Sequence, residues 1–153
     1  MLKKKSLFRI LIISLGTWIV FSYIILPLRL EGQSMEPNSP DGGFRFCWLQ
    51  KYFFLEPEHG DVVAIRFAGK RVVLLKRIVA LAGETVEFRN GILFVNNQRV
   101  EEPYVRYRSN WNLPSRQVAR GRVYVVGDNR GISMHRHHFG QVDMQRILGG
   151  VLW

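Results

Sequence analysis

Cysteine is nearly absent from this chain of 153 residues, in which Cys47 stands alone. A single cysteine excludes an internal disulfide, and no Cys-x-x-Cys pair indicates a zinc or redox site. Acidic residues are scarce as well, with 12 Asp and Glu against 22 Lys and Arg. The net charge of +10 suits an anionic lipid surface or a nucleic acid on charge alone. Internal repeats and amphipathic helical patterns are also lacking, which favours a mainly antiparallel β fold.

The stretch 10–28 has no formal charge, and its length of about 20 residues is what a membrane-spanning helix needs. We therefore predict a transmembrane helix over 10–28 that is ended by Pro27. The run is longer than the ~7–15 apolar residues of a cleaved signal peptide, and no small-x-small cleavage site follows it. An anchor makes membrane lipid the expected partner, and nucleic acid is not expected.

Positive charges come before this run, at Lys3, Lys4, Lys5 and Arg9. By the positive-inside rule, residues 1–9 form a cytoplasmic amino terminus and residues 29–153 an extracytoplasmic domain. In a bacterium the protein is then a single-pass protein of the inner (plasma) membrane, with its domain on the outer face.

After the anchor, short apolar runs alternate with turn residues, which predicts antiparallel strands. Asn90-Gly91 indicates a tight hairpin because both central positions require positive φ. A turn at Gly69-Lys70 is expected to join two neighbouring strands, and 106–120 is expected to be a surface excursion. A helical turn and a final strand are expected within 141–153. The other expected strands lie within 44–49, 60–67, 72–81, 85–88, 92–95 and 123–126.

An aromatic cluster, Tyr52-Phe53-Phe54-Leu55, lies next to Lys51 and a short distance after the anchor. Aromatic rings are favoured in the interfacial layer of a membrane, so the cluster is suited to dip into lipid. The same rings are equally suited to fill the core of the domain, and the sequence leaves both interpretations open.

Two stretches carry candidate chemistry. Ser34 lies in Glu31-Gly32-Gln33-Ser34-Met35-Glu36-Pro37, just beyond the anchor, and Lys76 is embedded in the apolar run Leu74-Leu75-Lys76-Arg77-Ile78-Val79. Burial disfavours an ammonium group and lowers the lysine pKa, so a neutral amine could accept the proton of a serine hydroxyl. The pair is a candidate Ser/Lys hydrolase dyad, although a turn serine and a snorkelling lysine explain each fragment taken alone.

Five motifs occur in a fixed order after the anchor, and together they resemble those of bacterial type I signal peptidases. These are membrane-bound Ser/Lys endopeptidases that remove signal peptides from exported proteins, and the resemblance covers nearly the whole chain. The motifs are Gly32-x-Ser34-Met35-x-Pro37, Gly60-Asp61-Val62-Val63, 76–84 beginning Lys76-Arg77-Ile78-Val79, Glu102-Pro103-Tyr104-Val105, and Gly127-Asp128-Asn129-Arg130 with Ser133 and Phe139-Gly140 after it.

The resemblance implies a barrel-like antiparallel β catalytic domain and a role for each matching residue. Ser34 would be the nucleophile and Lys76 the general base, with the backbone N–H of Ser34 stabilising the oxyanion. Ser133 would orient the lysine amine, and Asp128 and Arg130 would support the site. The substrate, the signal peptide of a preprotein, would bind as an added strand. Its small side chains would enter pockets lined by Met35, Ile78 and Ala80, and the export machinery is a further expected partner.

The chain departs from the family after Ser133. The family has an aspartate and an arginine where this chain has His135 and His137, so a supporting ion pair is lost. Imidazole titrates near neutrality, which suggests a pH-sensitive support in its place. A zinc site is not expected, because the adjacent His137 and His138 cannot easily converge on one ion; no metal or cofactor is predicted.

Two alternatives to a signal peptidase stay open from the sequence. One is a Ser/Lys peptidase with a narrower clientele, such as an enzyme that matures conjugation-pilin subunits. The other is an anchored, non-catalytic β module, in which the changed residues His135 and His137 mark a lost activity.

Overall fold

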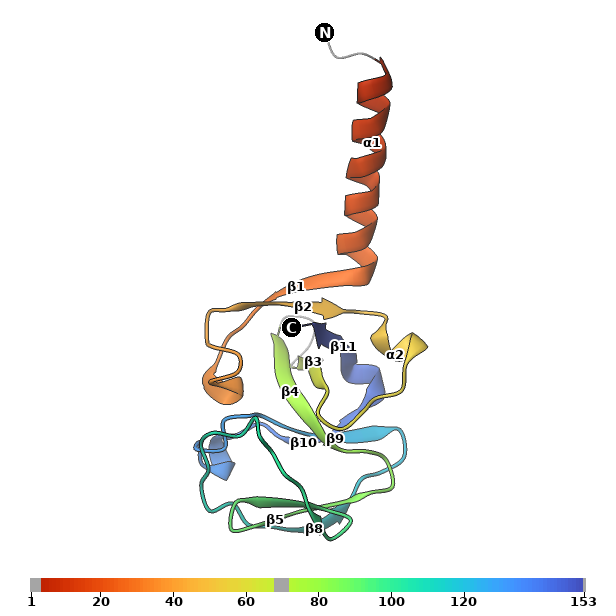
Figure 1. The fold of residues 1–153 in the computed structure, drawn as a ribbon. Helices are drawn as coiled ribbons and strands as arrows, with labels where there is room; N and C mark the ends of the chain where they lie inside the picture. Colours follow the sequence, from red (N-terminus) through yellow and green to blue (C-terminus); the bar gives the residue numbers. More distant parts are fainter. Residues whose placement is uncertain (1–3, 68–71, 153) are drawn as a thin grey trace.

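An apolar helix at the amino terminus stands apart from a β domain in the computed structural model, which describes residues 4–67 and 72–152 (Figure 1). Helix α1 spans Lys4–Ile19 and continues through a π-helical segment, Val20–Ile24, and none of the residues in α1 is buried. By length and composition, Lys4–Ile24 could cross a membrane.

The predicted helix end at residue 28 is wrong, because strand β1 takes up Ile25–Arg29. This strand pairs antiparallel with β2 (Phe44–Trp48), and Pro27 lies opposite Phe46. Strand β1 is at the edge of its sheet, where a proline without an N–H group is tolerated. The end of the apolar run therefore belongs to the domain, where Leu28 is part of the core.

A seven-stranded sheet contains β1 and β2 and is antiparallel at every pairing among the described residues. The strand order is β1-β2-β11-β3-β4-β9-β10. Neighbours β3 and β4 are antiparallel as predicted, whereas the expected turn at Gly69-Lys70 lies outside the described residues. The remaining strands are β3 (Val62–Phe67), β4 (Val72–Ala80), β9 (Arg122–Val126), β10 (Gly140–Asp143) and β11 (Ile147–Leu152). A 3₁₀ turn at Met144–Arg146 precedes β11, close to the expected helical turn.

A second sheet of four strands has the order β7-β6-β5-β8. The predicted hairpin joins β5 (Thr85–Arg89) to β6 (Ile92–Val95), and Asn90 and Gly91 both have positive φ. The other two strands are β7 (Gln98–Arg99) and β8 (Leu113–Gln117).

Strand β8 corrects the expectation that 106–120 is only a surface excursion. Its Pro114 is tolerated because β8 lies at the edge of the second sheet. The segment 106–120 contributes three buried residues to a core cluster with Phe88 of β5, namely Trp111, Leu113 and Val118. This largely polar segment is therefore part of the packed domain.

The aromatic cluster forms a short helix, α2 (Lys51–Phe54), which Figure 1 places on the side of the domain nearer to α1. Phe53 is 85% exposed and Phe54 66% exposed, so neither ring fills the core. Tyr52 alone points inward, where its hydroxyl donates to Asp61 Oδ2 at 2.9 Å.

Candidate functional site

Ser34 lies on a 3₁₀ turn, Gln33–Met35, that follows β1 and is fixed from both sides. Gly32 begins the turn with a φ of +99°, a conformation that residues with a side chain rarely adopt. Its N–H donates to Asp41 Oδ1 at 2.9 Å. On the other side, the backbone N–H of Asn129 donates to the Ser34 carbonyl at 3.0 Å, and the Asn129 side chain donates to the Gln33 carbonyl at 3.1 Å.

Strand β4 carries Lys76 to this turn. The side chain of Lys76 is 3% exposed, and its Nζ lies 2.6 Å from Ser34 Oγ, across 42 positions of sequence. Among the described residues, Ser34 is the only hydrogen-bond partner of the Lys76 amine. The two atoms therefore have the separation that proton transfer requires.

Burial lowers the pKa of Lys76 to about 8, against the opposing effect of the Asp128 carboxylate, which favours the ammonium form. A substantial fraction of the amine is then neutral slightly above pH 7. A neutral amine has a lone pair and can accept the Ser34 proton, which an ammonium group cannot do.

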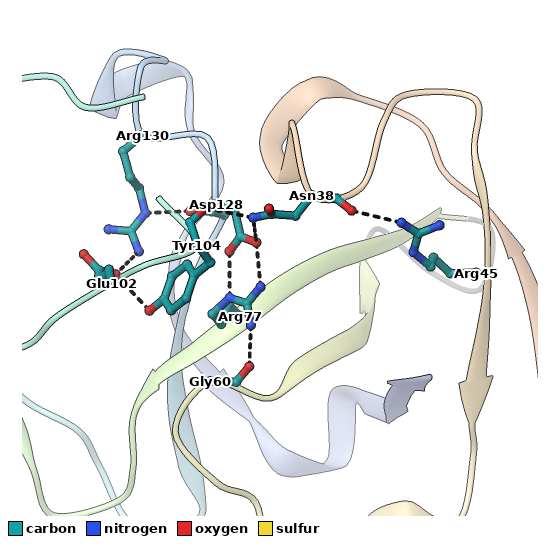
Figure 2. A network of polar contacts seen from close by, with 9 residues as sticks. Asn38, Arg45, Gly60, Arg77, Glu102, Tyr104, Asp128 and Arg130 are labelled. Carbon is teal, nitrogen blue, oxygen red and sulfur yellow. Dashed lines mark hydrogen bonds and ion pairs between the residues drawn. The ribbon is translucent and has the colours of Figure 1, made fainter. Parts of the chain in front are cut away.

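The neighbouring residue, Arg77, points to the opposite face of β4 and binds Asp128 through two hydrogen bonds (Figure 2). The distances are 2.8 Å from Nε to Oδ1 and 2.6 Å from Nη2 to Oδ2. Asn38 Nδ2 donates to the same carboxylate at 2.8 Å and to the Tyr104 carbonyl at 2.8 Å. This cluster ties the turn after β9 to β4 and to the segment that follows Ser34.

A second buried ion pair lies beside the first, between Arg130 and Glu102 (Figure 2). Arg130 Nη2 is 2.6 Å from Glu102 Oε1, which also accepts from the Tyr104 hydroxyl at 3.0 Å. The Tyr104 ring joins the two pairs, because the Arg77 guanidinium lies 4.1 Å from its centroid. Asp128 and Arg130, which the sequence suggested as supports, thus bind Arg77 and Glu102 and do not contact the dyad directly.

His137 lies inside the domain, whereas His135 is exposed. The Nε2 atom of His137 accepts a hydrogen bond from the Gly127 N–H at 3.0 Å, and its ring packs edge-on against Trp111. Burial, together with the positive charges of Lys76 and Arg130, lowers the pKa of His137 to about 3. His137 is therefore neutral near pH 7, and its imidazole in the folded protein does not itself titrate near neutrality.

Ser133 is not brought to the dyad. Its side chain is exposed in a shallow hollow with Trp111 and His135, and no hydrogen bond joins it to Lys76 within the part of the chain that the structure describes. The predicted lysine-orienting contact is thus missing. No group of three or more His, Cys, Asp or Glu side chains among the described residues could hold a metal ion.

A small hollow of about 20 Å³ opens beside Ser34, and Met35, one of the predicted pocket residues, lies in its lining. Ile78 and Ala80, the other predicted pocket residues, are fully buried and do not line it. The strand that does line it is the first half of β4, through Val73, Leu74 and Leu75. Sequence reasoning missed these residues because it considered the positions after the lysine.

The same half of β4 has an edge that no strand occupies in the described part of the chain. Strand β3 pairs along the whole of Val72–Arg77 on one side, whereas β9 begins to pair on the other side only at Arg77.

Three other functional positions were not assigned from the sequence. Asn129 holds the carbonyl of the Ser34 turn, Asn38 joins that segment to Asp128, and Glu102 neutralises Arg130. The signal for two of them was available, because Asn129 and Glu102 lie within the motifs that carried the resemblance.

Comparison with known proteins gives consistent matches. A family model described as "Signal peptidase, peptidase S26" matches residues 3–153. Signal peptidase I of Bacillus licheniformis is 31% identical over 162 residues, covering 96% of this chain and 87% of that protein. Signal peptidase IB of Staphylococcus aureus (strain COL) is 30% identical over 152 residues, covering 88% and 79% respectively.

A solved structure supports the fold. The crystal structure of a signal peptidase I from Enterococcus faecalis V583 has a TM-score of 0.53 and 27% sequence identity, and the match covers 64% of this chain and 98% of that one. The predicted fold class, mainly antiparallel β with an apolar amino-terminal helix, is confirmed.

Proposed function

Because the chain belongs to the signal peptidase family, peptidase S26, we propose that it is a serine endopeptidase that cleaves the amino-terminal signal peptides of exported preproteins. The observation that carries the mechanism is the 2.6 Å separation of Ser34 Oγ and Lys76 Nζ in a buried setting. This geometry also disfavours a non-catalytic β module, because burying a lysine without a counter-ion is costly and such strongly perturbed groups cluster at functional sites.

In the proposed reaction, Ser34 Oγ attacks the scissile carbonyl carbon while its proton passes to the neutral Lys76 amine. The backbone N–H of Ser34 donates to the oxyanion of the tetrahedral intermediate. The C–N bond then breaks, and Lys76 gives its proton to the leaving amine, which starts the mature protein. Water hydrolyses the acyl ester with Lys76 again acting as the base.

The free edge of β4 supports a binding mode for the substrate. A signal peptide in extended form would add to this edge through main-chain hydrogen bonds, and its alternate side chains would point toward the domain. The hollow beside Ser34 is small enough to select a small side chain next to the cut.

Helix α1 is the proposed membrane anchor, with the amino terminus in the cytoplasm and the β domain outside. Lys4, Lys5 and Arg9 near the start of the helix support this orientation by the positive-inside rule. The exposed rings of Phe53 and Phe54 support contact of α2 with membrane lipid. Anchoring would confine enzyme and substrate to one plane and raise their effective concentration. The export machinery in the same membrane is a further proposed partner.

The test uses the purified full chain in detergent with a model preprotein. Wild type should cleave it, whereas Ser34→Ala and Lys76→Ala should each lose at least about a thousandfold in kcat/KM, since dyad members act as a unit. Lys76→Arg is the matched control, because it keeps the positive charge and removes the base. Wild-type kcat/KM should rise about tenfold per pH unit and level off above about pH 8, as Lys76 deprotonates.

Retained cleavage by both alanine variants would overturn the dyad. A wild-type enzyme that leaves a panel of ordinary preproteins uncut but processes a pilin precursor would favour the narrower maturation peptidase.

A further inference from the structure

A second hollow, of about 150 Å³, opens on the seven-stranded sheet next to Lys76. Its lining includes Lys76, Leu74 of the same strand and Ile65, the cross-strand partner of Leu74 on β3. Side chains two residues apart on a strand share a face, so the hollow lies on the face of β4 that carries the Lys76 side chain. The inference drawn from this hollow rests on the proposed function, because it concerns the substrate of that same site.

The two members of the dyad line different hollows. Ser34 lines the hollow of about 20 Å³, whereas Lys76 lines the hollow of about 150 Å³, and Leu74 belongs to the lining of both. Because Ser34 Oγ and Lys76 Nζ are 2.6 Å apart, the dyad lies between the two hollows.

The proposed reaction assigns one side of the cut to each hollow. The residue before the cut stays on Ser34 as the acyl ester, whereas the leaving amine takes its proton from Lys76 and must come within about 2.6–3.2 Å of Nζ. The side chain of the residue after the cut begins two bonds from that amine nitrogen. The first side chain of the mature protein is therefore the one that reaches the hollow lined by Lys76.

Two basic side chains flank the Phe67 ring, which is part of the lining. The ring centroid of Phe67 lies 5.4 Å from that of His138 and 6.0 Å from the guanidinium carbon of Arg146. Both basic residues are exposed, and both line the hollow. No Asp or Glu is among the described residues that line it, so its exposed margin is positively charged against a largely apolar wall.

Arg146 is bound to the backbone but has no acidic partner in the described part of the chain. Its Nε and Nη2 atoms donate to the Arg66 carbonyl at 3.3 and 3.1 Å, and no hydrogen bond to a described residue uses Nη1. Asp143, the nearest acidic residue along the chain, accepts instead from the Gln145 N–H at 3.0 Å. A guanidinium presents its donors in a planar fork that matches a carboxylate, so Arg146 is suited to bind an anion that enters from outside.

We propose that this hollow is a specificity site for the first residue of the mature protein, and that Arg146 favours an acidic side chain there. A glutamate would lay its methylene groups on the apolar wall and carry its carboxylate to the Arg146 guanidinium. A cavity of about 150 Å³ holds a benzene-sized group, so the glutamate side chain fits. Glutamine has the same size without the charge, and lysine is repelled.

The experiment uses the full chain in a non-ionic detergent and preproteins that differ only in glutamate, glutamine or lysine immediately after the cut. The measured quantity is the ratio of kcat/KM for the glutamate and glutamine substrates, which cancels any general change in activity. Wild type should favour glutamate about threefold, the usual effect of one exposed ion pair, and added salt should reduce this ratio. Arg146→Gln should bring the ratio close to one, and Arg146→Glu should favour lysine over glutamine.

Arg120→Gln is the matched control, because Arg120 is exposed, lies outside the lining of the hollow and contributes the same charge. Its glutamate preference should equal that of wild type. A preference that is absent from wild type, or that persists unchanged in Arg146→Gln, would overturn the proposal. An equal loss in Arg120→Gln and Arg146→Gln would also overturn it, because net charge would then explain the preference.

If wild type cuts none of these preproteins, the proposed function fails, and the hollow is then tested by binding. The Kd values of glutamate and glutamine peptides that span the cut are compared in Ser34→Ala with and without Arg146→Gln. A glutamate preference that disappears with Arg146 supports the specificity site, and one that is absent or independent of Arg146 overturns it.

Discussion

Lys76 and Arg77 are adjacent on β4 and both are buried, but their side chains have different partners. Alternation along the strand sends Lys76 toward Ser34 and Arg77 toward Asp128. Arg77 has a carboxylate at 2.8 and 2.6 Å, whereas the Lys76 amine has only a hydroxyl. Strand β4 thus places two buried cationic side chains in two different environments.

The two environments give the adjacent residues different roles, with Arg77 supporting the structure around the site and Lys76 as the proposed base. A paired guanidinium keeps its charge and holds the turn that carries Asn129 against Ser34. A buried amine without a counter-ion has a lowered pKa, so it loses its proton more readily than an ordinary lysine and suits the role of base proposed for Lys76. Asp128 acts on both residues, because it neutralises Arg77 and also opposes the fall in the pKa of Lys76.

The largest expected effect comes from breaking the paired side with Asp128→Asn. The charge of Arg77 then stays buried without its carboxylate, and the free energy of unfolding should fall by about 3–5 kcal/mol. Urea denaturation in detergent, followed by tryptophan fluorescence, measures this change. The double variant Arg77→Met/Asp128→Leu is the control, since it removes both charges and should lose far less. A double variant as unstable as the single one would contradict the interpretation of a compensated pair.

Removing the Lys76 amine should change the free energy of unfolding in the opposite direction. Lys76 has an ordinary pKa of 10.5 and a folded value of about 8, so below pH 8 its burial costs about 3 kcal/mol at 1.36 kcal/mol per unit. Lys76→Met should therefore raise the free energy of unfolding by about 3 kcal/mol at pH 7 while it abolishes cleavage. Between pH 8 and 10.5 the wild type should gain stability and approach the variant, because the native amine has then lost its proton while the unfolded chain still holds one, and rising pH disfavours the state that binds more protons.

Denaturation at pH 7 and again at pH 10 tests this sign. Lys51→Met is the matched control, since Lys51 binds Asp61 at 2.6 Å and its removal should not stabilise the protein. Equal stability of wild type and Lys76→Met at both pH values would show that the amine is not desolvated in solution.

The features that could be predicted from the sequence are those with a local cause. Asn90-Gly91 specifies its hairpin through backbone conformation, and the apolar residues around Lys76 specify its burial. The end of the membrane helix has no such local cause. Hydropathy does not distinguish apolar residues that face lipid from Leu28, which packs in the core of the domain. Likewise, Pro114 is acceptable only because β8 is an edge strand, and sheet order depends on the whole chain.

The site shows the same division. The proximity of Ser34 and Lys76 was predictable because each residue lies in a distinctive segment. Ser133 was assigned by its position in a motif, and its exposed side chain lies instead in a hollow with Trp111 and His135. The burial of His137 could not be predicted, since three histidines within 135–138 look alike in sequence. Packing against Trp111 and Phe139, together with the hydrogen bond from the Gly127 N–H, places His137 in the interior.

The smallest expected effect concerns His137, whose Nε2 accepts the Gly127 N–H. The Cα of Gly127 packs so closely on the Ser34 carbonyl that a Cβ there would collide with it. His137→Phe keeps a ring and removes the acceptor, so at pH 8 it should cost about 1–2 kcal/mol of stability and lower kcat more than it changes KM. His137→Gln, which keeps an acceptor, should recover part of both losses.

The pH dependence separates this role from simple packing. The folded pKa of His137 is about 3 against an ordinary 6.5, so the unfolded chain gains a proton below pH 6.5 that the native protein does not. The stability advantage of wild type over His137→Phe should therefore be full at pH 8 and shrink as the pH falls toward 5. An advantage that is the same at both pH values would place His137 in water, and the turn behind Ser34 would then need another support.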